Sequence, residues 1–277
     1  MLRLLFALCL LPLTAAAQEV RVVSQTVGTD EMLLALADPE QIAALSHLAH
    51  DAQFSAAATE AAAYPRITTG DSEAILRYRP TLVLFTDYSR AELVERVRKS
   101  GVQVIVFDRY ATMEDVYANL RTLGRALGHE SRAEAIIAAS RVRMAALAVK
   151  LRGVKPVRVI NASTYGLLSG AGTTFQDLCD HAGAENVAST VGGFTGIVPE
   201  PTERMLAWPI DLLVLDGDMT VDEALAPLRD LLPYKYIEAV KRNRAIVMPS
   251  ALMASVTHHR IDGYELLARK LHPEVAW

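Results

Sequence analysis

Short apolar runs alternate with amphipathic stretches along most of this chain. Residues 81–85 (TLVLF) and 102–107 (VQVIVF) are nearly continuous apolar runs of strand length. The stretch between them, residues 90–100, places its leucine and both valines on one helical face. Near-continuous apolar strands separated by helices are typical of a parallel sheet that is covered on both faces. This part of the chain is therefore predicted to be α/β.

The middle of the chain interrupts that alternation. Residues 112–127 and 131–151 are predicted to be two long helices with no strand between them. The second is rich in alanine, a strong helix former. At 1.5 Å per residue, about 20 residues span about 30 Å, the width of a small domain. Strand-like runs then return at residues 157–161, 211–215 and 245–248.

We therefore predict an α/β fold with two Rossmann-like lobes, each built on a parallel sheet and joined by one long α-helix. Ligands of such sheets bind beyond the carboxyl ends of the strands, so the ligand cleft is expected between the lobes. The expected divisions are a signal peptide at 1–17, an N-terminal lobe at 18–129, a connecting helix at 130–153 and a C-terminal lobe at 154–277.

The amino end has the features of an export signal. Arg3 precedes an apolar stretch that ends in the small residues Ala15-Ala16-Ala17, the pattern that signal peptidase accepts. The stretch is shorter than the roughly 20 residues that cross a bilayer. We expect cleavage near Ala17 and Gln18 and a soluble mature protein in the periplasm.

Charge and cysteine content exclude several classes of protein. Loss of residues 1–17 leaves 27 basic and 32 acidic side chains, a net charge of −5. Nucleic-acid binding calls for a basic face, so no nucleic-acid partner is expected. Cys179 would be the only remaining cysteine, which excludes a disulfide framework and a cysteine-based metal site. We interpret it as a buried, inert thiol.

Several motifs occur in order across both halves of the chain. They are VVSQTVGTDEMLLAL at 22–36, AILRYRPTLVL at 74–84, GVQVIVFD at 101–108 and the segment GAGTTFQDL to GAENVA at 170–188. In these motifs the chain resembles the helical-backbone (class III) periplasmic substrate-binding proteins of ABC importers for iron-siderophores, haem and vitamin B12. The resemblance implies a ligand-capturing protein without catalytic activity. It implies a permease at the inner membrane as partner and no resident cofactor, because the transported chelate brings its own iron or cobalt. We expect a monomer.

The resemblance also implies two surface glutamates that dock on arginines of the permease. The matching positions are Glu73 and Glu203, each near the expected start of a helix. Without the resemblance, both would be interpreted as ordinary first-turn carboxylates that interact with the helix dipole.

Candidate ligand contacts follow the predicted strands. Tyr88, Arg90, Arg109 and Tyr110 each come directly after one. Arginine suits carboxylate or catecholate oxygens, and tyrosine can stack on a macrocycle. The other candidates are Tyr165, Arg66, His258, His259 and Arg260.

His258 and His259 form a conspicuous pair before the last predicted helix. Adjacent residues of an extended loop point in opposite directions, so both cannot easily ligate one metal. One of them could be an axial ligand to iron or cobalt. The alternative is a helix-capping or surface role.

Three functions remain open on these residues. The first is capture of a metal chelate: the arginines favour an iron-siderophore or haem, and the tyrosines leave cobalamin open. The second is a periplasmic binder of free zinc or manganese, which needs convergent histidine and carboxylate ligands. The third is a periplasmic hydrolase, for which neither a G-x-S-x-G nor an H-E-x-x-H motif is present.

Overall fold

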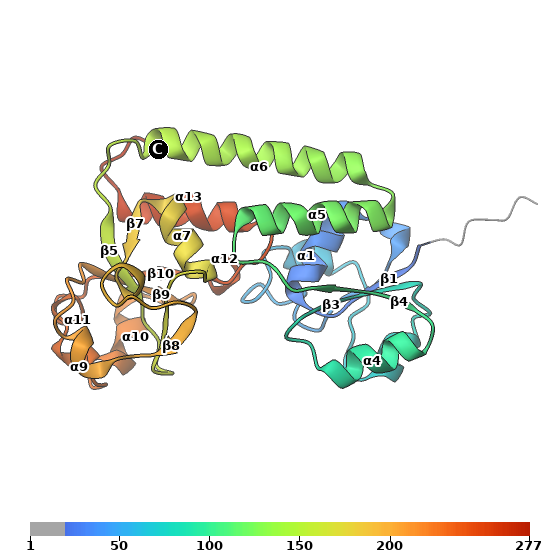
Figure 1. Cartoon of the computed structure of the whole chain (residues 1–277), viewed down its shortest axis with the longest axis horizontal. Coiled ribbons are helices and arrows are strands. Elements are labelled where there is room, and N and C mark those ends of the chain that lie inside the picture. Colours follow the sequence, from blue (N-terminus) through green and yellow to red (C-terminus); the bar gives the residue numbers. More distant parts are fainter. Residues whose placement is uncertain (1–19) are drawn as a thin grey trace, which may run out of the picture.

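The computed structural model describes residues 20–277, so the expected signal peptide and its cleavage site lie outside the described residues. For naming, we call residues 20–129 the first lobe and 154–277 the second lobe. Figure 1 shows the two lobes side by side, with one long helix running across both of them. No helix within the described part of the chain is long and apolar enough to cross a membrane.

The first lobe is built on a four-stranded parallel sheet in the order β2-β1-β3-β4. Its strands are β1 (Val22–Ser24), β2 (Ile42–Ala44), β3 (Leu82–Thr86) and β4 (Gln103–Phe107). Alternate residues of β3 face opposite sides of the sheet, as the strand period requires. Leu82 and Leu84 pack in one hydrophobic cluster and Val83 and Phe85 in another. The sheet is therefore covered on both faces, which confirms the expected layering.

Helices cover these two faces. On the side of Leu84 lie α1 (Val27–Leu36) and α5 (Met113–Leu127). On the side of Phe85 lie α3 (Ser72–Leu76) and α4 (Ala91–Lys99). The short elements η1 (Pro39–Gln41) and α2 (Ala58–Ala61) complete the lobe.

The long helix α6 (Glu130–Lys150) joins the lobes and contains 21 residues, as predicted from its alanine-rich sequence. Gly128 reverses the chain between α5 and α6 in the left-handed conformation, with φ of 76°, which glycine adopts without a Cβ penalty. Helix α6 packs first on α5 and then on α7 and α13 of the second lobe. In Figure 1, α5 and α13 lie nearly end to end beneath it.

The second lobe repeats the architecture with a parallel sheet in the order β10-β9-β5-β7. Its strands are β5 (Val157–Asn161), β7 (Ala184–Asn186), β9 (Leu212–Asp216) and β10 (Ala245–Met248). Its helices are α7 (Thr174–Ala182), α8 (Val187–Thr190), α9 (Thr202–Met205), α10 (Val221–Leu225), η2 (Ala226–Leu228), η3 (Tyr234–Tyr236), α11 (Glu238–Lys241), α12 (Ser250–Met253) and α13 (Arg260–Leu271). The thiol of Cys179, on α7, is buried, and burial raises its pKa, consistent with the inert thiol expected.

A small antiparallel pair in this lobe was not predicted. Strands β6 (Leu167–Ser169) and β8 (Ile197–Pro199) pair across about 30 intervening residues. Three residues are too few to show a period of two in the sequence. Directly after β6, Gly170 allows the two segments to approach closely: a Cβ there would lie 2.4 Å from the Phe194 carbonyl oxygen.

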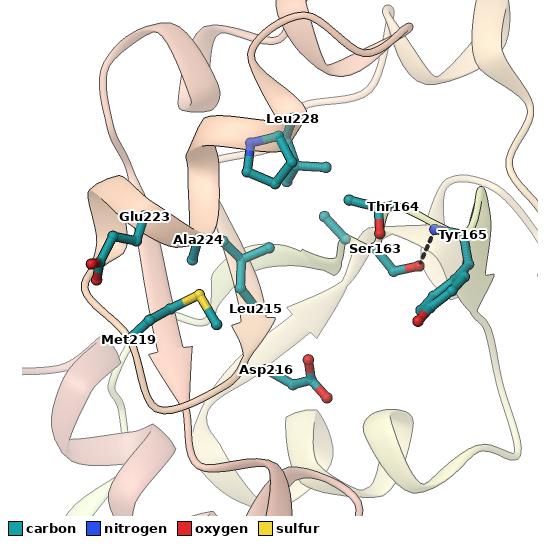
Figure 2. A pocket seen from close by; sticks show the side chains of 11 residues that line it. Ser163, Thr164, Tyr165, Leu215, Asp216, Met219, Glu223, Ala224 and Leu228 are labelled. Atoms are coloured by element: carbon teal, nitrogen blue, oxygen red, sulfur yellow. Dashed lines mark hydrogen bonds between the residues drawn. The ribbon is translucent and has the colours of Figure 1, made fainter.

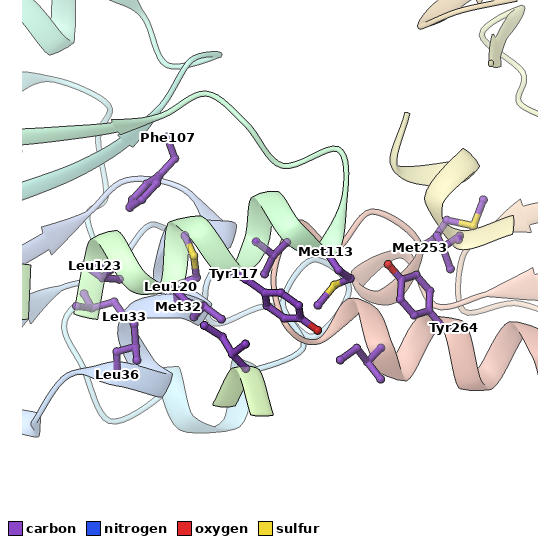
Figure 3. Packing of buried hydrophobic residues seen from close by; sticks show 14 of the residues in the cluster. Met32, Leu33, Leu36, Phe107, Met113, Tyr117, Leu120, Leu123, Met253 and Tyr264 are labelled. Atoms are coloured by element: carbon purple, nitrogen blue, oxygen red, sulfur yellow. The ribbon is translucent and has the colours of Figure 1, made fainter. Parts of the chain in front are cut away.

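The main hydrophobic cluster crosses from one lobe to the other. Met113 and Tyr117 of α5 belong to the same cluster as Met253 and Tyr264 of the second lobe. Figure 3 shows these side chains along one continuous layer. The two lobes therefore share a core as well as a connecting helix.

Asp30, near the start of α1, is a fully buried carboxylate. It accepts hydrogen bonds from the backbone N–H and the hydroxyl of Ser46. Burial, which disfavours the charged form, raises the pKa of Asp30 from 3.8 to about 6. The folded protein therefore binds the Asp30 proton more tightly than the unfolded chain does.

We predict that Asp30→Asn changes the pH dependence of stability. Between pH 3.8 and about 6 the wild type holds a proton that the unfolded chain releases, so its unfolding free energy falls as pH rises through this window. The full effect is at most about 3 kcal/mol. Asparagine has nearly the same shape and does not titrate. Urea unfolding of both proteins is measured at pH 4, 5, 6 and 7. The free energy of unfolding of the variant should rise relative to that of the wild type as pH increases. A difference between the two free energies that stays constant with pH would contradict the prediction.

Candidate ligand cleft

The carboxyl ends of the strands in the two sheets meet at a cleft. A cavity of about 190 Å³ lies there, with walls from both lobes. The first lobe contributes residues that follow β1 and β3, and the second contributes α12 and the segment after it. The lining residues are Val27, Gly28, Glu31, Phe54, Tyr88, Ala251, Ala254, Ser255 and Val256. We call this the interlobe cavity.

A second cavity of about 200 Å³ lies at the carboxyl ends of β5 and β9. Figure 2 shows Met219, from the loop after β9, across this cavity from Tyr165, in the loop after β5. Asp216, the last residue of β9, also lines it. The Tyr165 side chain is 87% exposed. Either cavity alone is smaller than the roughly 300–1,000 Å³ usual for a small-molecule site, and a macrocycle needs more room still. A large ligand would therefore lie in the open cleft against both.

Two predicted tyrosines form an aromatic wall on the first lobe. The rings of Tyr88 and Tyr110 meet edge to face, with centroids 6.1 Å apart. The Tyr110 hydroxyl donates to Asp87 at 2.8 Å. Burial and this hydrogen bond raise the pKa of Tyr110 well above its usual range, so the phenol stays neutral. Tyr88 remains 60% exposed and available for stacking.

Carboxylates are frequent in the loops that follow the strands. Asp87 and Asp108 come after β3 and β4, and Asp216 and Asp218 stand at the end of β9 and just beyond it; all four are exposed. Arg109 lies among them and pairs with Asp115 at 2.9 Å, while its own side chain is 79% exposed. Exposed aspartates thus outnumber arginines among these residues, although arginines, and not these aspartates, were predicted from the sequence as ligand contacts.

The other two exposed arginine candidates lie away from the interlobe cavity. The Arg90 guanidinium donates to the Gly70 carbonyl and lines a separate hollow with Asp71 and Arg96. Arg66 forms an isolated parallel bridge with Leu45, at the edge of the first sheet. Neither residue lines the cavities described above.

Arg260, predicted to contact the ligand, has a different role. Its side chain is 0% exposed, and its guanidinium donates to Asp177 and to three backbone carbonyls. A direct ligand contact is incompatible with this burial, so that prediction was wrong. The sequence could not reveal it, because a loop arginine before a helix is usually exposed.

His258 and His259 lie half-buried behind the cleft. Their rings are 4.2 Å apart, and burial with the neighbouring His259 lowers the pKa of His258 to about 4. Burial opposes protonation of His259 as well, but Asp262, 3.4 Å away, and Glu31 together raise its pKa. Neither histidine lines the interlobe cavity. Residues 20–277 contain no group of three or more histidine, cysteine or acidic side chains placed to hold a metal ion.

Glu31 was missed as a residue of the cleft. Its buried carboxylate accepts from the Ala56 N–H at 2.8 Å and, across the lobes, from the Thr257 hydroxyl at 2.6 Å. Burial raises its pKa. Its position shortly after β1 was a usable signal, since residues there lie near the ligand edge of the sheet.

The two predicted docking residues are both exposed. Glu73 lies in the first turn of α3, where Asp71 caps the helix by accepting from the Ala74 N–H at 2.8 Å. Glu203 lies in the first turn of α9. Helix α3 packs on α4, and Figure 1 shows α4 and α9 at the lower ends of the two lobes, on the side away from α6.

The model of a family described as periplasmic binding protein matches residues 22–252. A cobalamin-binding protein from Halobacterium salinarum is 28% identical over 206 residues, which cover 68% of this chain and 56% of that protein. The chain thus spans only a little over half the length of that relative.

Solved structures of similar fold cover nearly the whole chain. A periplasmic haem-binding protein from Pseudomonas aeruginosa is 22% identical, with a TM-score of 0.77, over 92% of this chain and 94% of that one. The periplasmic haem-binding protein RhuT from Roseiflexus sp. RS-1 is 20% identical, with a TM-score of 0.75, over 92% and 98%. At these identities the structures establish the shared fold.

We predict that Gly28→Ala disrupts the contact between the lobes. A Cβ at position 28 would lie 2.4 Å from Cγ2 of Val256, so the Val256 side chain, α1 or the second-lobe segment must move. Such overpacking costs about 1–3 kcal/mol. Urea unfolding should show this loss for Gly28→Ala. In a Val256→Ala background, which lacks the clashing methyl group, Gly28→Ala should reduce the free energy of unfolding much less. Equal effects of Gly28→Ala in the wild-type and Val256→Ala backgrounds would contradict the predicted clash, because the helix propensity of alanine acts equally in both.

Proposed function

This chain belongs to the periplasmic binding protein family, and from that premise we propose that it captures a metal chelate between its lobes and delivers it to an ABC importer at the inner membrane. It acts as a soluble monomer in the periplasm after cleavage near Ala17 and Gln18. It performs no catalysis of its own, and any iron or cobalt arrives with the ligand.

The observation that carries this proposal is the aromatic lining on both sides of the cleft. Tyr88 lines the interlobe cavity and packs edge to face on Tyr110, and Tyr165 lines the second-lobe cavity opposite the Met219 thioether. Flat aromatic surfaces bury large areas of a macrocycle at little entropic cost, because their rings have few rotatable bonds. The rims contain carboxylates that can orient polar groups at the edge of such a ligand.

Among metal chelates, the charge of the cleft favours a corrinoid such as cobalamin. Asp87, Asp108, Asp216 and Asp218 would repel the carboxylates of haem or of an anionic siderophore. A corrinoid bears neutral amide side chains, whose N–H groups can donate to these carboxylates. The similarity to the cobalamin-binding protein of Halobacterium salinarum agrees with this choice.

An iron chelate is the alternative. The sequence favoured an iron-siderophore or haem on the strength of its arginines. In the structure Arg260 is buried and Arg90 donates to a backbone carbonyl, which leaves Arg109 as the arginine beside the aromatic wall. The shared fold with periplasmic haem-binding proteins keeps haem as the second candidate. Free zinc or manganese has no supporting ligand cluster within residues 20–277.

Titration of the mature protein, residues 18–277, tests the proposal. Cyanocobalamin, haemin and a ferric siderophore are each added and followed by calorimetry and tyrosine fluorescence. We expect cyanocobalamin to bind with a dissociation constant of about 1 μM or tighter. If haemin or the siderophore binds more tightly than cyanocobalamin, the transported ligand is an iron chelate and the corrinoid proposal is wrong. Binding of none of the three would overturn the function itself.

A charge-neutralising variant separates these ligands further. Asp108→Asn with Asp218→Asn keeps the shape of two exposed rim side chains and removes their charge. The variant should weaken cyanocobalamin binding several-fold through the loss of charge-assisted hydrogen bonds and strengthen any residual haemin binding. The same substitution at Asp180, an exposed residue of α7 that lines neither cavity, is the control.

We further propose that Glu73 and Glu203 contact the permease. Both are exposed first-turn carboxylates, one on each lobe. Helix α4, on which α3 packs, and helix α9 lie on the side of the molecule away from α6 (Figure 1). One carboxylate per lobe suits a two-point contact with basic residues of a membrane partner, which fixes orientation and assists encounter.

We predict that Glu73→Ala with Glu203→Ala abolishes delivery but not capture. Transport by importer reconstituted in liposomes should fall at least about tenfold, while the affinity for ligand stays within about twofold. The matched control is Glu130→Ala, another exposed first-turn glutamate, on α6 and therefore on the opposite side. Undiminished transport by the double variant would refute docking through these residues.

A further inference from the structure

Arg260 reaches from the second lobe into the loop of the first lobe that contributes the aromatic wall. It is the first residue of α13 and is completely buried. Its Nη2 donates to the Tyr110 carbonyl at 2.6 Å and its Nη1 to the Ala111 carbonyl at 2.9 Å. Its Nε donates to the Ser255 carbonyl at 2.8 Å, within its own lobe. One side chain thus joins segments about 150 residues apart.

A buried acid balances the charge of this guanidinium. Asp177, on α7, accepts from Nη1 of Arg260 at 2.9 Å and is itself only 7% exposed. The Tyr264 hydroxyl donates to the same carboxylate oxygen, and the Tyr264 ring stacks on His181 with centroids 4.5 Å apart. Burial of an unpaired guanidinium would be prohibitive, so Asp177 makes the reach into the first lobe possible.

The loop that Arg260 binds has three consecutive carbonyls held in place. Asn119 of α5 donates to the Arg109 carbonyl at 2.7 Å, and Arg260 donates to the next two. The first bond comes from the same lobe and the other two from the opposite lobe. The backbone of Tyr110 is therefore set by the second lobe, although its ring belongs to the wall of the first.

We propose that Arg260, neutralised by Asp177, is a positioning residue for the ligand: it holds the Arg109–Tyr110 loop so that the Tyr110 ring meets Tyr88. This inference rests on the proposed function. A planar guanidinium donates in three directions at once, whereas a lysine ammonium on a flexible chain cannot reproduce that pattern. The charge of Arg260 is retained in Arg260→Lys, but the geometry is lost.

A double-mutant cycle on cyanocobalamin affinity tests the proposal. Arg260→Lys should weaken binding about tenfold, the value of a well-placed aromatic contact. In a Tyr110→Ala background the same change should have little further effect, because the positioned ring is already gone. Equal losses in both backgrounds would mean that Arg260 acts only on global structure, and the proposal would be wrong.

A second measurement does not depend on any ligand, so its outcome separates this inference from the proposed function. Fluorotyrosine is placed at position 110, and its ¹⁹F signal is recorded without ligand. Arg260→Lys should shift or broaden this signal, because the ring loses its fixed position. Thr257→Val, which removes the other interlobe bond at Glu31, is the matched control and should leave it unchanged. An unaltered signal in Arg260→Lys would overturn the positioning role even if cyanocobalamin binds.

Should Arg260→Lys fail to fold, Arg260→Gln with Asp177→Asn replaces it. This variant removes both buried charges together and leaves neither of them unpaired. The glutamine amide carries its two donors on a single nitrogen of a shorter side chain, so it cannot reproduce the pattern of the three guanidinium nitrogens. The same shift of the residue 110 signal is expected, and its absence contradicts the proposal in the same way.

Discussion

The structure depends on how polar groups are buried where the two lobes meet. The segment 255–260 of the second lobe makes this seam: Thr257 bonds the Glu31 carboxylate, and Arg260 bonds two carbonyls of the first lobe. A buried polar group that loses its partner costs free energy, so the lobes must meet in one register for these bonds to form. The hydrophobic cluster that α5 and α13 share packs the two lobes together in the same register.

This constraint has a direct consequence for the cleft. The residues that face a ligand are presented from loops after the strands, and loops are the most adaptable part of such a fold. Here the Arg109–Tyr110 loop is tied at three carbonyls. Binding then requires less ordering of that loop, which favours affinity for a rigid, flat ligand. The long helix α6 and the interlobe contacts of residues 255–260 together keep the two walls of the cleft at a fixed distance.

Much of the architecture could be predicted from the sequence because it follows from local patterns. The apolar runs at β3 and β4, the alanine-rich α6 and the left-handed stop at Gly128 each identify an element without knowledge of its neighbours. Tyr88, Tyr110 and Tyr165 were predicted as ligand contacts for a related reason, since residues directly after parallel strands lie at the ligand edge. Short strands such as β6 and β8 were missed because three residues show no period.

What the sequence by itself determined is the order and type of the elements and which loops lie at the cleft, since periodicity and chain connectivity decide both. Only the tertiary structure decided the role of each charged side chain. Arg260 and Arg109 are both loop arginines in the sequence, yet one is buried against Asp177 and the other is exposed beside Asp115. The burial of a charge depends on partners distant in the chain, and no local pattern encodes where those partners lie.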